Sequence, residues 1–454
     1  MIRQVAYLLL CFAAFCSLGT AQSLKVFFGN LHSHTSYSDG SGTPDDAYRH
    51  AREVAHLDFL AITEHNHLQA ENGAGERKDG ILIAKDHSLY VGPQPEALIP
   101  EAKKWTEDGK FVAIYGQEFS AISKGNHANV FDVPRVIDVP NGRFDLLVNN
   151  WIPNNLDSFG KPAIVQFNHP AISGSPDSLE YGRDDFANEE EWIRKMDGVA
   201  YLIEILNGPA MAETDGHRSE EVMERDYLSY LNLGFHLAPT GDQDNHYRTW
   251  GSVTDTRTAV IAEELSKAKL FEAIRKSHVY ATEDKNLRVI CRVNGHLCGD
   301  RFPAPQTGSE LKIDISINDG DEPDASYQIE VFSDTIGGSQ KAEAIDTIPV
   351  AGNTANSISI EDVKYTGGFQ YIFFKITQLG EDGQDDHAWT APVWLEPGSV
   401  PDGGGEAASF VASKNSSVYH VSLDCRGAQR IKESNRVFGA EAKAGRVKHE
   451  GCPK

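Results

Sequence analysis

The sequence predicts an α/β barrel followed by a small antiparallel β-sandwich and a short C-terminal module. Between residues 22 and 287, short apolar runs alternate with helical stretches, which is the pattern of parallel strands joined by crossover helices. From residue 288 to 397 the pattern changes to short alternating segments separated by Gly, Asp and Asn, which is typical of an antiparallel sandwich. A barrel is favoured over an open sheet because the turn after the first strand has histidines where a dinucleotide-binding turn needs glycines.

The size and charge of the chain limit its classes of function. Its 454 residues suggest two to four domains, and 40% hydrophobic with 24% charged residues is typical of a globular protein. The net charge of −24 argues against a nucleic-acid polymer as partner, because phosphate contacts need clustered Lys and Arg. A small phosphorylated substrate stays compatible with this charge, because bound cations would invert the local field.

Residues 1–21 have the features of a cleaved signal peptide. Arg3 is followed by an apolar run and then by the small residues Gly19-Thr20-Ala21, which fit a cleavage site. The apolar run is shorter than a membrane span. We therefore expect a mature chain that begins near Gln22, is secreted or periplasmic, and has no membrane span.

The expected strands and helices of the first region follow one another along the chain. The strand-like runs are "KVFFGNL", "LDFLAIT", "FVAIYG", "AIVQF", "VAYLIEIL", "HLAPTG" and "TAVIA". The helix "TPDDAYRHAREVAH" begins with Thr43 as N-cap and Pro44 at its first position, and "SEEVMERDYLSYLNLG" stops at Gly234. A third helix is "LSKAKLFEAIRKSH".

The second region contains a hairpin and two cysteines. The pair Asn294-Gly295 in "CRVNGHLC" is a strong signal for a two-residue turn, and it sets Cys291 opposite Cys298. The two cysteines fall at a hydrogen-bonded pair, where the strands are less close, so the residues leave a disulfide between them open. Four cysteines follow residue 21, and in an oxidising compartment we expect all four to be oxidised.

Histidines and acids follow strand after strand. His32 and His34 are two residues apart at the end of the first strand, so both imidazoles project from one face. The next strands run into "EHNH", "QEF", "NHP" and "DQDNH", whereas His127 precedes its apolar run. In a parallel barrel all strand C-termini share one face, so these residues would converge there. Imidazoles with carboxylates indicate a metal site.

The ordered motifs "HSHTSYSDG", "AITEHNH", "YGQEFS", "GNHANVF", "QFNHP" and "TGDQDNHYRTWG", followed by "VYATEDKNL", resemble those of the PHP (polymerase and histidinol phosphatase) superfamily of metal-dependent phosphoesterases. The chain looks most like the branch that includes a carbaryl hydrolase. This resemblance implies a distorted (β/α)7 barrel over residues 22–287 with up to three metal ions.

The resemblance also implies the ligands of each ion. His32, His34, Glu118 and Asp244 would hold one ion, Glu118 would bridge to a second ion held with His127 and His169, and Asp39, His65 and His246 would hold the third. Two positions depart from the family pattern: Asp39 stands where some members have His, and Glu64 stands where Asp is common. The first departure puts the occupancy of the third ion in question.

The ligand set suits two or three divalent ions of Zn, Mn or Fe rather than an iron–sulfur cluster. Water bound to such an ion loses a proton near neutral pH, so the expected reaction is hydrolysis by metal-hydroxide attack. We expect His67 and Arg248 to be the catalytic residues, through phosphate contact or protonation of the leaving group. Arg77 and Lys78 are weaker candidates, for which loop solvation is favoured.

Residues 398–407 have the composition of a linker, and residues 408–454 resemble small Ada-like cysteine modules. This tail lacks the Cys-x-x-Cys pair of those modules, so a Cys425–Cys452 disulfide is favoured over a zinc site at His420 and His449.

The expected function is that of a secreted phosphoesterase acting on a phosphodiester or a small organic phosphate. One alternative is a carbamate, ester or amide hydrolase that uses the same metal site. The other is an inactive barrel that serves as a surface module, with the sandwich binding a glycan or a cell surface.

Overall fold

The structure is a computed structural model that describes residues 24–67, 82–120, 127–170, 181–219, 221–336, 343–350, 357–368, 370–380 and 383–396, with four short strands after residue 410. The strands of the first region are β1 (Lys25–Asn30), β2 (Phe59–His65), β3 (Val112–Ser120), β4 (His127–Phe131), β5 (Val165–Asn168), β6 (Ala200–Asn207), β7 (Glu221–Val222), β8 (Ala238–Gly241), β9 (Arg257–Ala262) and β10 (Val279–Thr282). Its helical segments are α1 (Pro44–Glu53), α2 (Ser88–Val91), α3 (Leu98–Trp105), α4 (Phe144–Leu146), η2 (Leu147–Trp151), α5 (Ile152–Asn154), η4 (Arg183–Asp185), α6 (Glu189–Asp197), α7 (Glu224–Leu233) and α8 (Lys267–Ile274).

The second region consists of strands. They are β11 (Arg288–Val293), β12 (His296–Leu297), β13 (Arg301–Pro303), β14 (Ile313–Asn318), β15 (Ser326–Thr335), β16 (Glu343–Val350), β17 (Ile358–Ile360), β18 (Gln370–Leu379), β19 (Asp386–Thr390) and β20 (Val393–Glu396). Beyond it, β21 (Val411–Ser413) pairs with β23 (Arg436–Phe438), and β22 (Val418–Tyr419) pairs with β24 (Val447–Lys448). No helix of the described residues is long and apolar enough to cross a membrane.

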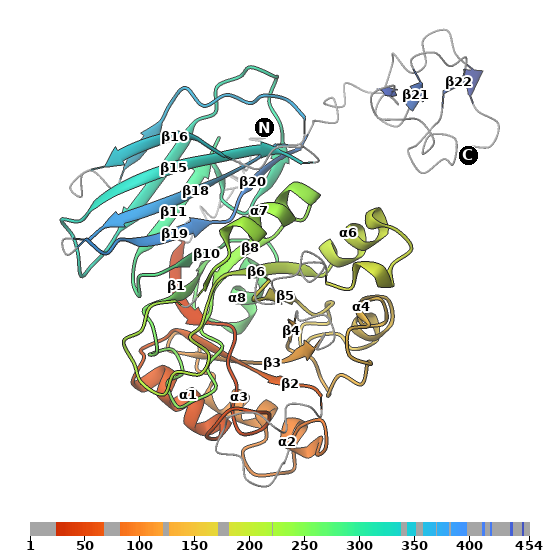
Figure 1. Ribbon diagram of the computed structural model, residues 1–454, viewed down its shortest axis with the longest axis vertical. Coiled ribbons are helices and arrows are strands. Elements are labelled where there is room, and N and C mark those ends of the chain that lie inside the picture. The colour runs from red at the N-terminus through yellow and green to blue at the C-terminus, as the bar shows by residue number, and fades with distance from the viewer. Residues whose placement is uncertain are drawn as a thin grey trace, which may run out of the picture.

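The expected (β/α)7 barrel is wrong, because the strands form one mixed sheet. Sixteen strands belong to this sheet, in the order β13-β20-β18-β19-β10-β9-β1-β2-β3-β4-β5-β6-β7, with β8 attached to β6, β15 to β18, and β16 to β15. The longest helices of the described residues, α1 and α7, have ten residues each. The molecule is therefore a predominantly β structure with short helices packed on part of its sheet (Figure 1).

The strand–helix alternation breaks where a connection contains no crossover helix. Only residues 121–126 separate β3 from β4, and a parallel neighbour needs about a dozen connecting residues or more. Accordingly, β4 is antiparallel to both β3 and β5. Residues 242–256, between β8 and β9, contain no helix, and β9 is antiparallel to β1 and β10. The apolar runs marked the strands, but the loop lengths decided their directions.

The sheet continues from the first region into the second. β10 pairs with β19, where Tyr280 lies opposite Thr390 and Thr282 lies opposite Ala388. A second sheet, β12-β11-β14-β17, packs against the β15, β18 and β20 part of the large sheet. The apolar core between these layers also contains Val26 and Phe28 of β1. The sandwich and the first region therefore share a sheet and a core.

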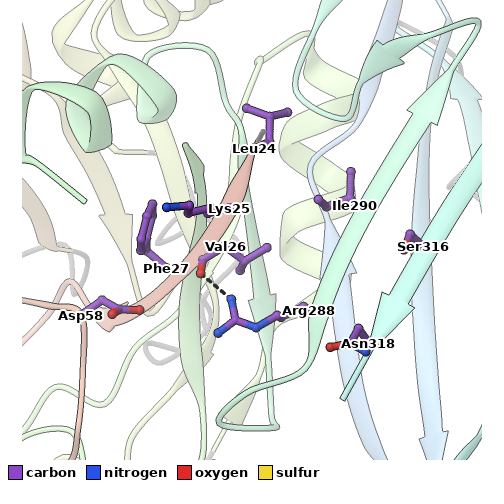
Figure 2. A pocket seen from close by; sticks show the side chains of 9 residues that line it. All are labelled: Leu24, Lys25, Val26, Phe27, Asp58, Arg288, Ile290, Ser316 and Asn318. Carbon is purple, nitrogen blue, oxygen red and sulfur yellow. Dashed lines mark hydrogen bonds between the residues drawn. The ribbon is translucent and has the colours of Figure 1, made fainter. Parts of the chain in front are cut away.

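A cavity of about 420 Å³ lies where β1 meets the sandwich strands β11 and β14 (Figure 2). Arg288 lines this cavity and donates from Nη1 to the carbonyl oxygen of Val26 at 2.7 Å. Its guanidinium also lies 5.1 Å from the ring centre of Phe28. Arg288 thus joins the two regions across this cavity.

Local signals at the ends of elements are confirmed. Thr43 caps α1, and its side chain and that of Asp46 form a reciprocal capping box. Gly234 ends α7 with a φ of 108°. Asn294 and Gly295 have φ values of 51° and 84°, which is the backbone of a tight hairpin turn.

The hairpin brings the two cysteines together without a disulfide. Cys291 and Cys298 are buried free thiols, although the N–H of Cys298 donates to the carbonyl oxygen of Cys291 at 3.0 Å. The expectation of an oxidised pair is therefore not met at these positions. The signal peptide and the cysteines and histidines of the tail, at 420, 425, 449 and 452, lie outside the described residues.

Candidate metal centre

The ends of six parallel strands meet at one edge of the first region. β1, β2 and β3 are mutually parallel, and β5, β6 and β8 are as well. Because β4 is antiparallel to both β3 and β5, β5 runs in the direction of β3. The C-terminal ends of all six strands therefore face the same way. The antiparallel direction of β4 also brings its first residue, His127, to this edge.

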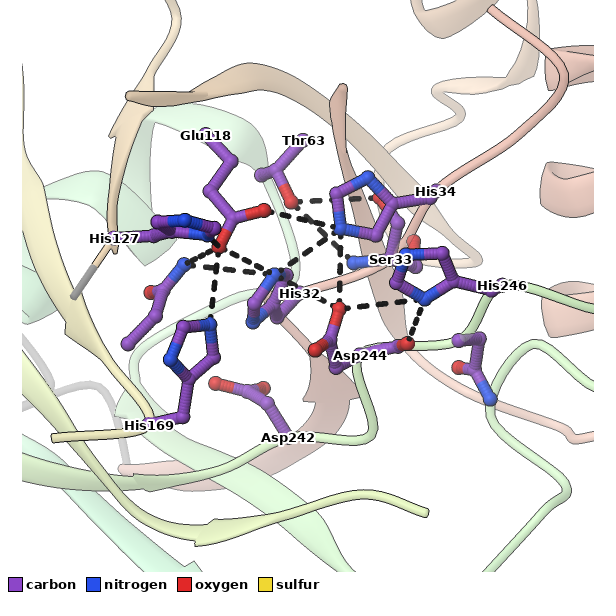
Figure 3. Close-up of polar contacts among 12 residues, drawn as sticks. His32, Ser33, His34, Thr63, Glu118, His127, His169, Asp242, Asp244 and His246 are labelled. Atoms are coloured by element: carbon purple, nitrogen blue, oxygen red, sulfur yellow. Dashed lines mark hydrogen bonds and ion pairs between the residues drawn. The ribbon is translucent and has the colours of Figure 1, made fainter. Parts of the chain in front are cut away.

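All nine predicted metal ligands lie at this edge, close to one another. Figure 3 shows seven of them: His32, His34, Glu118, His127, His169, Asp244 and His246. They form four overlapping groups, and within each group one donor atom from every residue lies within 4.8 Å of the others. The groups are His34, Asp39, His65 and His246; His32, His169 and Asp244; His32, His34 and Glu118; and His65, Glu118 and His127. Seven of the nine are buried, and Asp39 and His127 are half-buried. These buried histidine and carboxylate groups could hold a metal ion.

Glu118 is the centre of the cluster. Its Oε1 lies 2.9 Å from His127 Nδ1 and 3.2 Å from His169 Nε2, and its Oε2 lies 3.0 Å from His65 Nδ1. His34 Nε2 is 3.3 Å from the same Oε2. One carboxylate therefore faces imidazoles from four different segments, as a bridging ligand would.

The grouping differs from the expected ligand sets at His169, His34 and His65. His65 groups with Glu118 and His127 as well as with Asp39 and His246. His169 groups with His32 and Asp244, while its Nε2 also lies near Glu118. His34 groups with Asp39 as well as with Glu118. The donors at this edge thus form one continuous array, in which His32 and His34 each belong to two groups.

The charges of the cluster stabilise one another. Burial alone would lower the pKa of His34, but Asp244 and Glu118 outweigh it and raise this pKa to about 10. Burial would raise the pKa of Asp39, but His65 and His246 hold it well below its usual range. The carboxylates are therefore ionised at neutral pH and can act as ligands.

Several buried donor atoms make no hydrogen bond, although three of the four are in ion-pair contact with another member of the cluster. They are Asp39 Oδ1, His65 Nδ1, His169 Nδ1 and Asp244 Oδ1. Buried polar atoms without partners are costly, and a bound cation would satisfy the carboxylate oxygens among them. The residues fit a metal on this ground and on their chemistry, since nitrogen and oxygen donors without thiolate suit Zn, Mn and Fe ions.

Glu64, one of the two departures from the family pattern, supports the loop that carries His34 and Asp39. Its buried carboxylate accepts hydrogen bonds from the N–H of Thr35 at 3.0 Å and from the hydroxyls of Thr35 and Ser38. Ser38 Oγ is in turn 3.3 Å from His34 Nδ1. The carboxylate therefore stabilises the loop between the two ligands.

His67, an expected catalytic residue, lies beside the donor groups and belongs to none of them. Its ring centre is 5.0 Å from that of His65 and 6.4 Å from that of His127. Both of its nitrogens are buried without a hydrogen-bond partner. Burial, followed by His65 and His127, lowers the pKa of His67 to about 4. His67 is therefore a neutral imidazole at neutral pH.

Arg248, the other expected catalytic residue, lies at the surface. Its Nη1 is 3.3 Å from Asp46 Oδ2 in the first turn of α1, and about half of its side chain is exposed. Arg77 and Lys78 lie outside the described residues. The structure therefore brings His67 to the cluster and places Arg248 in an ion pair with α1.

Sequence reasoning missed two residues that contact the ligands. Glu204 of β6 is fully buried and lies 2.7 Å from His32 Nδ1. Asn168 donates from Nδ2 to Glu118 Oε1 at 3.1 Å. The signal for Glu204 was available, because it is the single acid in the otherwise apolar run "VAYLIEIL". The amide of Asn168 gave no comparable signal, since it follows its strand like any loop residue.

Comparisons with known proteins do not assign the chain to a family. No family model and no curated protein matches it. The soluble domain of PmoD from Methylocystis sp. ATCC 49242 (Rockwell) is similar over 24% of this chain and 90% of its own, with 17% identity and a TM-score of 0.17. A likeness of this size says nothing about fold or function. The fold and site define a predominantly β protein, built on one mixed sheet, with a buried histidine–carboxylate cluster.

Proposed function

We propose that this chain is a metal-dependent hydrolase acting on a phosphodiester or a small organic phosphate. The observation that supports it is the convergence of nine ionisable donors, from segments spread over residues 32–246, into four overlapping groups at one strand edge. Burying so many ionisable groups costs free energy, and a purely structural core has no use for them. The motif resemblance to the PHP superfamily points to the same chemistry.

The number and kind of ions follow from the donors. Four overlapping groups that share His32, His34, His65 and Glu118 favour two or three ions close together, and the donor set favours Zn, Mn or Fe. Ions in such an arrangement lower the pKa of bound water and stabilise the negative charge that develops on phosphoryl oxygens.

The residues of the chain have separate tasks in this proposal. Glu118 and Asp244 supply the negative charge that offsets adjacent cations, and the imidazoles fix their positions. His67, neutral and free of hydrogen bonds at the margin of the cluster, can donate a hydrogen bond to substrate from one ring nitrogen or accept a proton at the other. The exposed Arg248 can release Asp46 to contact an anionic substrate.

The test combines metal analysis with a substrate panel. Purified protein, prepared without chelator and soaked with Mn²⁺ or Zn²⁺, should contain two or three equivalents of metal by elemental analysis. It should hydrolyse chromogenic phosphodiesters or phosphomonoesters, and His67→Ala should slow turnover without loss of metal. A preference for carboxyl esters or carbamates would replace the phosphoesterase proposal by the alternative hydrolase, and protein without metal would overturn both.

A further inference from the structure

Glu204, on β6, contacts two of the candidate ligands, His32 and His169. Its Oε1 lies 2.7 Å from His32 Nδ1, and its Oε2 accepts from the backbone N–H of His169 at 2.5 Å. Asn207 Nδ2 donates to the same Oε2 at 2.9 Å. Each oxygen of this fully buried carboxylate therefore has a donor, and two of the three donors belong to metal-ligand candidates.

The contact with His32 decides which nitrogen of this ring can bind a metal. A carboxylate accepts hydrogen bonds, so Nδ1 of His32 carries the proton that it donates to Glu204. The lone pair is then left on Nε2, which lies 3.1 Å from Asp244 Oδ1 and 3.3 Å from His34 Nε2. This is the nitrogen that faces the other donors (Figure 3).

The contact with His169 holds an uncommon backbone. His169 has a φ of 30°, a value that non-glycine residues rarely adopt. The hydrogen bond from its N–H to Glu204 is buried and stabilises this conformation. His32 follows β1 and His169 follows β5, so the carboxylate on β6 fixes ligands from two separate strands.

We propose that Glu204 is the positioning residue of the metal centre, which sets the tautomer of His32 and the backbone of His169 at the same time. Carboxylates that accept from the second nitrogen of a metal-bound histidine are known to raise metal affinity. The inference rests on the proposed metal-dependent function and concerns the residues that prepare the site, before any substrate binds.

Glu204→Gln separates this role from simple burial of a side chain. The amide has the same shape but only one acceptor oxygen, because its second group donates. If the oxygen faces His169, the proton of His32 must move to Nε2, which then cannot bind a metal. If the oxygen faces His32, the amide group repels the N–H of His169. Either orientation impairs one ligand.

Asp242→Asn is the matched control. Asp242 is fully buried and accepts from the N–H of Leu31, the hydroxyl of Thr258 and the amide of Gln166, and none of these three donors belongs to a candidate ligand. Metal affinity of wild type and both variants would be measured by competition with a chromogenic chelator for Zn²⁺. We expect Glu204→Gln to bind about 10- to 100-fold more weakly and Asp242→Asn to stay within a few-fold of wild type.

Each outcome bears on a different claim. Wild-type protein that binds no Zn²⁺ overturns the proposed function itself. If wild type binds Zn²⁺ and Glu204→Gln binds it with the same affinity, only the proposed role of Glu204 is overturned. An equal loss of affinity in Asp242→Asn would overturn that role as well. If Glu204→Gln fails to fold, histidine nitrogen NMR of the zinc-loaded wild type decides, with His32 assigned from the spectrum of His32→Gln. A proton on Nδ1 supports the inference, and an Nδ1 without a proton overturns it.

Discussion

The two ends of the large sheet bury opposite kinds of side chain. At the edge formed by the ends of β1, β2, β3, β5, β6 and β8, the buried residues include His32 and Glu118, which are at most 1% exposed. In the sandwich, the equally buried residues include Ile329, Phe374 and Ile376. Apolar burial stabilises a fold, whereas burial of ionisable groups costs free energy unless they are paired. The sandwich end of the sheet should therefore govern stability, and the edge with the histidine–carboxylate cluster should govern ligand binding.

The largest effect should come from the centre of the edge. Glu118→Gln removes a negative charge that faces five imidazoles, so adjacent cations would repel one another with little screening. We expect metal content to fall and turnover to drop at least about a hundredfold. Elemental analysis and kinetics measure both, with Glu101→Gln, a carboxylate paired to Lys104 away from the cluster, as control. Full metal content and near-normal turnover would show that Glu118 does not bridge.

The sandwich should respond in the opposite way. Phe374 is fully buried in the apolar core, so Phe374→Ala should lower the free energy of unfolding by about 3–5 kcal/mol. Metal affinity of the folded protein should not change. Urea denaturation and chelator competition test the two halves of this prediction, and Phe374→Leu should lie between wild type and Phe374→Ala in stability. A parallel loss of metal affinity would mean that the two ends are coupled.

A half-buried acid between the two ends, Asp284, should give a pH-dependent effect. Burial, followed by Asp319 and Asp386, raises the pKa of Asp284 to about 6. Because this folded pKa is above the unfolded value, the charged form is disfavoured in the native protein, and stability falls as pH rises from about 4 through 6. Asp284→Asn keeps an oxygen that can accept from the N–H groups of Asn286 and Leu287.

The substitution should therefore stabilise the protein on the order of 1–3 kcal/mol at pH 7.5 and have little effect at pH 4. Urea denaturation at the two pH values measures the difference. A gain of equal size at both values would rule out titration of Asp284 as its cause.

An exposed charge pair should matter least. Arg301 and Glu396 approach within 2.6 Å, but their side chains are 49% and 35% exposed. Exposed pairs contribute at most about 1 kcal/mol, so Arg301→Met should change the free energy of unfolding by less than that. Thermal denaturation in 0.5 M salt should show a still smaller change in the free energy of unfolding, because salt screens exposed charges. A loss as large as that of Phe374→Ala would contradict the distinction between buried and exposed charge.

Local features of this chain could be predicted from the sequence, and long-range pairing could not. Thr43, Gly234 and the Asn294-Gly295 turn act through their own backbones, so their effects are readable from neighbouring residues. The convergence of the ligands was readable as well, because histidines and acids follow strands that turned out to be parallel. His127 precedes its strand and still reaches the same edge, because β4 is antiparallel to β3.

The arrangement of the strands in one mixed sheet, rather than in a barrel, depended on which strands become neighbours. The pairing of β10 with β19 joins residues more than a hundred positions apart, and no local pattern marks it. The role of Glu204 also depended on tertiary contacts, since only the fold places β6 behind His32 and His169. Both kinds of contact join residues that are far apart in the sequence and form only when the sheets and helices pack together.

The continuity of the sheet has a consequence for how the chain unfolds. The change of pattern near residue 287 separates two segments by composition, but the backbone of β10 is hydrogen-bonded to β19 on the far side of that point. A fragment that ends there would expose the β10 edge, and unpaired edges recruit other chains. Both segments should therefore melt in one cooperative transition, and we expect that the half with the histidine–carboxylate cluster cannot be transplanted as an independent module.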